Sequence, residues 1–505
     1  MQTRFFLFAK NINELEKQLN VAGRSLEELS RTFDLIFWSG DGEPPIKGDP
    51  PKTAPYTAPT KSGDAQAEVI QRQAALMRGG PPDEKGHNNP WVLFDSDGNR
   101  LCPENEELVR GFAQPYEGAR DDVEKLFADL REAAQKFGPE VEQIAGIEIG
   151  PDTFTVAPNW EHWCSGTGLG YSFATRPHAE RLIDAQALQE DELTGDGVNI
   201  LVIDQGIDKD YVNALGGVGT YGGGFGLEIG GVLVRQPGTA DAPYVKTQRE
   251  HGSMMVRSLL ALAPEARIWD LPMIPPQIAD VPTFADLATL AIFAVRSLKT
   301  CVDEPWIVVN AWGIDDRFGE DVWGDYSNNE HHALNVEYGL LGEQHDVVFA
   351  AGNSGQFYPD QEAGPYDRGP GNSILGANGH RHVTSVGAVR TDALWIGSSS
   401  QGPGPTTFSP GADRVNEKPD LCAPSYFMEP QDAGLRSGGT SAASAITAGA
   451  LAALRQRWPV ADVSTTEMRE ALRAGARRIW HSGWNGRMGA GILNLTGTMG
   501  HLPSA

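Results

Sequence analysis

The sequence is poor in the residues that mark several classes of protein. Its 505 residues include only 4 cysteines, widely separated, which excludes a CxxC metal or redox pair and a dense disulfide framework. Basic side chains number 41 against 67 acidic ones, and the formal net charge of -26 disfavours binding to nucleic acid or to an anionic membrane surface. We therefore expect no nucleic-acid or membrane partner. We expect mostly reduced core positions for Cys102, Cys164, Cys301 and Cys422.

Long apolar runs are also missing. The first twenty residues contain only five consecutive apolar residues, which is too short for the core of a signal peptide. No stretch approaches the roughly 18 apolar residues that span a membrane. These absences predict a soluble, cytoplasmic protein. The length allows two or three domains, and the 40% hydrophobic content is enough for at least one large core.

The N-terminal region has a mixed pattern of short strands and helices, interrupted by a proline-rich segment at 40–64. We expect a small α+β domain over residues 1–157, followed by a linker over 158–194. The expected strands are 4–9, 33–38, 144–149 and 153–157, and the expected helices are 11–19, 65–78 and 119–137.

From residue 195 to residue 505 apolar strands alternate with helical patterns. The expected strands are 198–204, 306–312, 346–351 and 382–389, and the expected helices are 251–262, 283–298, 331–345 and 441–457. Alternation of this kind predicts an α/β fold with a doubly wound, mostly parallel sheet flanked by helices. Such sheets place their chemistry beyond the carboxyl ends of the strands, so polar residues there are candidates for a functional site.

Two polar residues suit a proton-transfer pair. Asp204 ends the first apolar strand, where a buried carboxylate needs a partner such as an imidazole N–H group. His251 begins a helix, whose dipole disfavours the imidazolium form and suits a neutral general base. Each has an ordinary alternative, a turn-forming aspartate and a structural histidine.

Two further polar residues suit a nucleophile and its oxyanion. Asn353 lies in a glycine-flanked turn after a strand, where its amide can donate to a developing negative charge. Ser441 lies where a glycine-rich turn enters a helix, so backbone N–H groups point toward it. A common turn sequence and an N-cap serine are the structural alternatives. The order Asp, His, Asn, Ser within one α/β region favours the functional interpretation of all four.

The motifs that carry these residues resemble those of the subtilases, the subtilisin-like serine proteases. They read GVNILVIDQGID, HGS, VVFAAGNSG and GGTSAASA, and supporting blocks extend the resemblance over residues 195–495. The resemblance implies that Asp204 orients His251, that His251 takes the proton of Ser441, and that Ser441 attacks a peptide carbonyl. Asn353 and the Ser441 N–H group would hold the oxyanion. It also implies that the chemistry needs no cofactor; structural calcium, which many members bind, has no assignable ligands here.

The resemblance also locates the substrate. An extended peptide would pair with a strand leading into Ala311, Trp312 and Gly313. Its specificity side chain would enter a pocket between that segment and Ala350, Ala351 and Gly352. The chain departs from the usual family residues at Gln205, Ser253, Ala442 and Ala445, and also at Ala311, where the family usually has serine. These departures bear on subsite preference, and Ala445 in place of a proline bears on the first turn of the serine helix.

Several alternatives stay open. Residues 1–157 resemble either a propeptide or a permanent docking domain for a regulatory protein partner, and the protease would then be intracellular and regulated. A catalytically silent peptide-binding scaffold and an acyl-transferring peptide cyclase or ligase are the alternatives to a serine endopeptidase. An α/β-hydrolase esterase is disfavoured because Ala443 stands where GxSxG needs glycine.

Three smaller motifs have structural interpretations. The GxGxxG match at 217–222 does not lead into a helix, so we predict a mobile loop bordering the cleft. The pair His331-His332 lacks zinc-ligand spacing, and we predict a surface position on a helix. Ser437 and Ser444 flank Ser441, and we expect both to form hydrogen bonds with the backbone.

Overall fold

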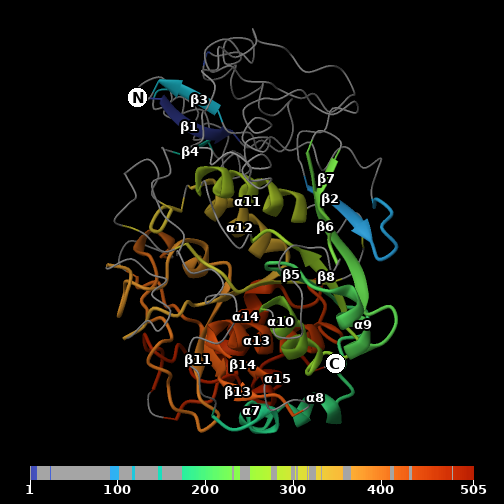
Figure 1. Cartoon of the computed structure of the whole chain (residues 1–505). Helices are drawn as coiled ribbons and strands as arrows, with labels where there is room; N and C mark the ends of the chain where they lie inside the picture. Colours follow the sequence, from blue (N-terminus) through green and yellow to red (C-terminus); the bar gives the residue numbers. More distant parts are fainter. Residues whose placement is uncertain are drawn as a thin grey trace.

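The structure is a computed structural model, shown in Figure 1. It describes residues 2–7, 23, 91–101, 116–119, 125, 146–149, 173–229, 232–238, 251–274, 281–296, 302, 305–314, 317, 326–330, 332–356, 366–409, 414–430, 435–479 and 482–504. Several predicted features lie outside these residues: the helices at 11–19 and 65–78, most of the helix at 119–137, the strands at 33–38 and 153–157, and the proline-rich segment at 40–64.

A large twisted sheet forms the centre of the molecule (Figure 1). Its strands follow the order β12-β11-β10-β9-β5-β8-β6-β2, with β7 paired to β6. All neighbours from β12 to β6 are parallel, and only β2 and β7 run antiparallel to β6. The strands are β2 (Trp91–Asp95), β5 (Asn199–Ile203), β6 (Tyr221–Ile229), β7 (Val232–Arg235), β8 (Arg267–Leu271), β9 (Trp306–Asn310), β10 (Asp346–Ala350), β11 (Thr384–Val389) and β12 (Leu421–Pro424). The predicted α/β fold with a mostly parallel sheet is confirmed.

Helices cover both faces of this sheet, which explains why the central strands are apolar at successive positions. In β5, Ile200 and Val202 belong to one core, whereas Leu201 and Ile203 belong to the core on the opposite face. Successive side chains of a strand point to opposite faces, so both faces of β5 are buried. The first core includes residues of α7 (Arg176–Leu182), α8 (Gln186–Glu190), α9 (Lys209–Gly216), α10 (His251–Leu260), α13 (Gly439–Arg455), α14 (Thr465–Gly475) and α15 (Leu495–Met499); the second includes α11 (Val281–Val295) and α12 (Ala333–Gln344).

The N-terminal region contributes to two different sheets. Strands β1 (Gln2–Leu7), β3 (Tyr116–Ala119) and β4 (Gly146–Ile149) form a small antiparallel sheet in the order β3-β1-β4, and β4 lies beside α12. The sequence analysis predicted two of these strands, at 4–9 and 144–149. It did not predict β2, which comes from the same region of the chain but extends the large sheet through β6.

The interval assigned to a linker is not all irregular. Within 158–194, α7 lies beside β13 (Phe427–Met428) and α8 beside α15, and Ala179, Ile183 and Leu188 are buried in the first core. The boundaries of the domains drawn from the sequence remain a prediction.

The glycine-rich segment that matches GxGxxG is a turn followed by a strand. The expected loop is present at 217–220, which form a turn, but the expectation is wrong for 221 and 222, because β6 begins at Tyr221 and continues through the glycines after it. A Cβ on Gly223, whose φ is +140°, would lie 2.1 Å from the backbone oxygen of Phe94 in β2. One on Gly224 would lie 2.3 Å from the oxygen of Asp270 in β8. Glycine is needed here because the neighbouring strands approach closely.

The prediction of a surface position is wrong for His332. This residue is fully buried and caps α12, where its Nδ1 accepts a hydrogen bond from the backbone N–H of Leu334 at 3.3 Å. Its ring packs edge-on against Tyr326, with ring centroids 5.3 Å apart. His331 lies outside the described residues.

One cysteine falls within the described residues. Cys422 is a free thiol in β12, fully buried, and burial raises its pKa well above its usual value. A thiol in such surroundings is an inert core residue, as the sequence analysis expected for this position. The other three cysteines lie outside the described residues.

Candidate active site

Asp204 and His251 form a buried hydrogen-bonded pair. Asp204 follows β5 directly, and His251 is the first residue of α10. The distance between His251 Nδ1 and Asp204 Oδ2 is 2.7 Å, and the two residues are 1% and 3% exposed. An ionised carboxylate can only accept, so the proton of this bond resides on Nδ1 and Nε2 is left as the basic nitrogen.

Two glycines allow the helix to approach the strand end this closely. Gly206 has a φ of +120°, which L side chains rarely adopt. A Cβ on Gly252 would lie 2.3 Å from the backbone oxygen of Gly206. The first turn of α10 therefore contacts the loop after β5 directly, and this contact brings His251 to Asp204.

Ser441 lies in the first turn of α13, as the sequence predicts. The helix begins at Gly439, whose φ is +69°, and continues without interruption through Ala445 to Arg455. Ser441 is 4% exposed. Among the described residues His251 Nε2 has no hydrogen-bond partner, so its bond to Ser441 Oγ is not formed in this structure. In free enzymes such bonds are often long and shorten when substrate binds.

The side-chain amide of Asn353 has a fixed orientation. Its Oδ1 accepts hydrogen bonds from the backbone N–H and the hydroxyl of Thr440, at 3.0 and 3.1 Å. Because a backbone N–H group can only donate, the oxygen must face Thr440 and Nδ2 must point elsewhere. A Cβ on Gly439 would lie 3.4 Å from Asn353 Nδ2 and 3.7 Å from Ser441 Oγ, so both atoms border the same small space.

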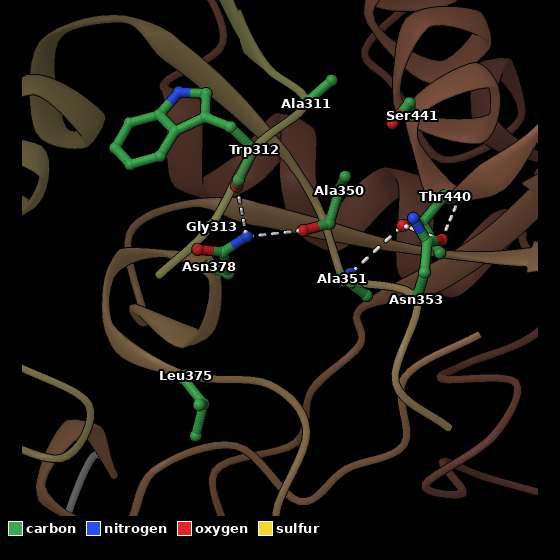
Figure 2. A pocket seen from close by; sticks show the side chains of 11 residues that line it. Ala311, Trp312, Gly313, Ala350, Ala351, Asn353, Leu375, Asn378, Thr440 and Ser441 are labelled. Atoms are coloured by element: carbon green, nitrogen blue, oxygen red, sulfur yellow. Dashed lines mark hydrogen bonds between the residues drawn. The ribbon is translucent and has the colours of Figure 1, made fainter. Parts of the chain in front are cut away.

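The sequence analysis did not assign a role to Thr440. Its hydroxyl also accepts a hydrogen bond from the backbone N–H of Gly352 at 3.1 Å. This residue therefore ties the serine turn to the segment that carries Asn353 (Figure 2). Its place inside the GGTS motif was the available signal.

One pocket adjoins Ser441 and Asn353 and is open to solvent at its mouth. All six residues predicted to bind substrate line it: Ala311, Trp312, Gly313, Ala350, Ala351 and Gly352. Leu375, Asn378 and Thr440 also line it, and sequence reasoning missed them. Figure 2 shows the two wall segments facing each other, with Ser441 beyond them. Asn378 lies in the 3-10 helix η2 (Gly376–Gly379) and Leu375 caps it; this segment gave no sequence signal.

Trp312 contributes its backbone to this pocket, not its ring. Figure 2 shows the indole directed away from the other lining side chains. The ring packs in the core beside α12, with its centroid 5.8 Å from that of Phe349, and Nε1 donates to Asn310 Oδ1 at 3.2 Å. Substitution of the indole would therefore change the packing behind the pocket wall and not the lining of the pocket itself.

A second buried carboxylate, Asp270, lies near Asp204. Asp270 in β8 is fully buried, and its Oδ2 accepts hydrogen bonds from the backbone N–H groups of Gly238 and Ile207, at 3.0 and 3.4 Å. Its Oδ1 has no partner among the described residues. Burial raises the pKa of Asp270 to about 7, and the nearby charge of Asp204 adds to this. Asp270 holds the loop that follows Asp204.

The strand before the serine turn is held by a buried ion pair. Glu429 accepts two hydrogen bonds from the Arg176 guanidinium, both at 2.6 Å, and one from the hydroxyl of Ser437. The expectation that Ser437 bonds to the backbone is therefore wrong. Its partner is the carboxylate of Glu429, the residue that follows β13 (Phe427–Met428), and Ser437 itself belongs to β14 (Arg436–Ser437). The same expectation is confirmed for Ser444, whose hydroxyl donates to the Ser441 backbone oxygen at 2.8 Å.

Within the part of the chain that the structure describes, no group of three or more His, Cys, Asp or Glu side chains is arranged to hold a metal ion. No helix in that part combines the length and apolar character needed to cross a membrane. Residues 315–325, which include several acidic side chains, lie largely outside the described residues, and structural calcium stays a prediction.

Comparison with known proteins identifies the class. The subtilase family model matches residues 195–491, which is more than half of the chain and includes all four candidate catalytic residues. The chain belongs to the subtilase family and has the scaffold of its serine proteases. No curated protein matches it.

Similar solved structures come from several bacteria. MycP1 from the ESX-1 type VII secretion system is 19% identical, with 69% of this chain and 89% of that chain covered and a TM-score of 0.43. The CspB protease of Clostridium perfringens is 14% identical, with 64% and 98% covered and a TM-score of 0.47. A serine protease of Aeromonas sobria is 13% identical, with 70% and 69% covered and a TM-score of 0.43.

Proposed function

We propose that this chain is an active serine endopeptidase. Ser441 is the nucleophile, His251 the general base and Asp204 the residue that orients His251. The observation that carries the proposal is the buried 2.7 Å hydrogen bond between His251 Nδ1 and Asp204 Oδ2. It leaves Nε2 as the proton acceptor, and a silent peptide-binding scaffold has no need for it.

The first half of the reaction forms an acyl-enzyme. The peptide carbonyl carbon adjoining the pocket is attacked by Ser441 Oγ while His251 Nε2 takes the hydroxyl proton. Asp204 stays ionised and stabilises the imidazolium. The proton then passes to the leaving amine as the peptide C–N bond breaks, and water later releases the acyl group by the same two proton transfers in reverse.

The negative charge on the carbonyl oxygen is held by Asn353 Nδ2 and the backbone N–H group of Ser441. Asn353 is suited to this because Thr440 fixes the orientation of its amide before any substrate arrives. A donor that needs no reorientation stabilises the transition state most effectively. In another member of this family, loss of the oxyanion-hole amide costs about 2.7–4 kcal/mol.

Labelling with a fluorophosphonate probe tests the proposal. We expect wild type to react at Ser441 and the Ser441→Ala variant not to react. Ser409→Ala is the matched control, because Ser409 lies in a surface turn after η3 (Thr406–Phe408) and should leave labelling unchanged. Absence of Ser441-dependent labelling, with and without added calcium, would contradict the proposal.

Residues 1–157 are proposed to regulate this activity, as a propeptide or as a docking domain for a protein partner. Part of the region supports retention: Trp91 and Leu93 of β2 are buried in the core beside α11, and their removal would uncover β6. We therefore expect residues 91–101 to stay with the protease after any cleavage. Native chromatography followed by mass spectrometry would test this, and a fragment starting near 160–195 without them would contradict it. Location in the cytoplasm stays a prediction.

A further inference from the structure

Asn378 closes the floor of the pocket beside Ser441. It follows Ala377 in the 3-10 helix η2 (Gly376–Gly379) and reaches between the two wall segments. Its Nδ2 donates to the backbone oxygen of Trp312 at 2.9 Å and to that of Ala350 at 2.8 Å. Figure 2 shows this amide bridging the walls from one to the other.

The amide of Asn378 has only one possible orientation. Both wall oxygens can only accept hydrogen bonds, so the nitrogen must face them and Oδ1 must face away. Oδ1 is buried and has no partner among the described residues. With Nδ2 saturated and Oδ1 covered, Asn378 offers no polar atom to a bound side chain. Its effect on the substrate is therefore steric.

The floor is anchored from outside the pocket. The backbone N–H of Ala377 donates to the Tyr326 hydroxyl at 3.1 Å. The N–H of Gly376 donates to the Ser327 backbone oxygen at 2.9 Å. Asn416 Nδ2 donates to the oxygen of Gly379 at 2.9 Å. A substrate side chain cannot push this segment away without breaking several buried hydrogen bonds, each costly to leave unmade.

The walls and the floor together define what fits. The walls present alanine and glycine, and Leu375, which is 4% exposed, also lines the pocket. None of the described residues that line the pocket carries a charge. A charged side chain would lose its hydration there without gaining an ion pair.

We propose that Asn378 is a specificity-determining residue, and that the enzyme cuts after small, uncharged residues such as alanine, serine or glycine. The inference rests on the proposed peptidase function. The Asn378 amide that bridges Trp312 and Ala350 fixes the depth of the pocket. Leucine, phenylalanine and lysine are therefore excluded as the substrate residue that precedes the cleaved bond. Gly313 supports this packing, since a Cβ there would lie 3.3 Å from Asn378 Nδ2.

Peptides identical except for the residue before the cut provide the test. With alanine, leucine, phenylalanine or lysine at that position, we expect wild type to show at least a tenfold higher kcat/KM for alanine than for the others. The Asn378→Ala variant should raise the leucine-to-alanine ratio of kcat/KM at least tenfold. The ratio is measured on one preparation, so a loss of correctly folded enzyme cancels. Asn372→Ala is the matched control, because Asn372 is exposed in the same segment and does not line the pocket.

A second variant guards against misfolding. Asn378→Ser shortens the floor while keeping one hydroxyl that can donate to a wall oxygen, and it should shift the ratio in the same direction. A wild type that cuts after phenylalanine as readily as after alanine overturns the inference. The inference is also overturned if both variants still react with the fluorophosphonate probe but their leucine-to-alanine ratio of kcat/KM equals that of wild type. A wild type that neither reacts with the probe nor cuts any peptide overturns the peptidase proposal and this inference together.

Discussion

Replacement of Asp270 by asparagine should change how the stability of the protein depends on pH. Asp270 is fully buried, and its pKa is raised from 3.8 to about 7, mainly by burial. The native state therefore keeps the proton over an interval in which the unfolded chain has lost it. The contribution of Asp270 to the free energy of unfolding is therefore fully present below pH 3.8 and is lost as the pH rises through 7. A shift of about three units corresponds to about 4 kcal/mol at 1.36 kcal/mol per unit.

The asparagine side chain of the Asp270→Asn variant would not titrate, and its Oδ1 can still accept from Gly238 and Ile207. This variant should thus match wild type near pH 4 and be more stable by about 4 kcal/mol at pH 8. About 2 kcal/mol of this difference should develop between pH 5 and pH 7. Lys418, whose pKa burial lowers to about 8, also titrates near this range, but its contribution cancels in the difference between the two proteins.

The assay is urea unfolding followed by tryptophan fluorescence at pH 5, 6, 7 and 8. Both proteins carry Ser441→Ala, so that self-cleavage cannot distort the curves. Asp196→Asn is the matched control, because Asp196 is exposed and its replacement should give a difference that does not vary with pH. A difference between Asp270→Asn and its parent that stays constant from pH 5 to pH 8 would refute the assignment of Asp270 as a buried neutral acid.

Three other substitutions test the remaining contacts. Asn353→Ala should lower kcat roughly 100- to 1,000-fold with little change in KM, which steady-state kinetics on one peptide would show; an unchanged kcat would exclude it from the oxyanion site. Gly252→Ala should cost roughly 1–3 kcal/mol and lower kcat, since its Cβ would meet the Gly206 oxygen at 2.3 Å, whereas Gly500→Ala should be neutral in the same melting assay. Glu429→Gln should cost about 3–5 kcal/mol because it leaves Arg176 buried and unpaired, against less than about 1 kcal/mol for Glu330→Gln in a more exposed pair; equal losses would contradict this.

The sequence was sufficient to predict the parallel α/β class and four strands of the large sheet, β5, β9, β10 and β11. Each central strand is buried on both faces, and such strands read as continuous apolar runs, as β5 and β10 do. Asp204 directly follows β5, Asn353 lies three residues after the end of β10, and Ser441 lies in the first turn of α13. The local pattern was sufficient there because a few neighbouring residues determine both the burial of the strand and the place where it ends.

The missed features depend on partners that are distant in sequence. The glycines of β6 have low strand propensity, and only the close approach of β2 and β8 explains them. Ser437 meets a carboxylate from a neighbouring strand, and Asn378 meets the carbonyls of two separate walls. The local sequence does not indicate which asparagine or serine will form a hydrogen bond with a residue that is distant in the chain.

The pairing of β2 with β6 also has a consequence for folding. Trp91 pairs with Leu227, so this edge of the sheet closes a loop of roughly 130 residues. The pairs β5 with β8 and β9 with β10 join much nearer segments and can form earlier. During synthesis β2 leaves the ribosome long before β6 has been made. Until then Trp91 has no neighbouring strand against which to pack. The edge strand is therefore expected to dock last, onto a sheet already assembled around Asp204.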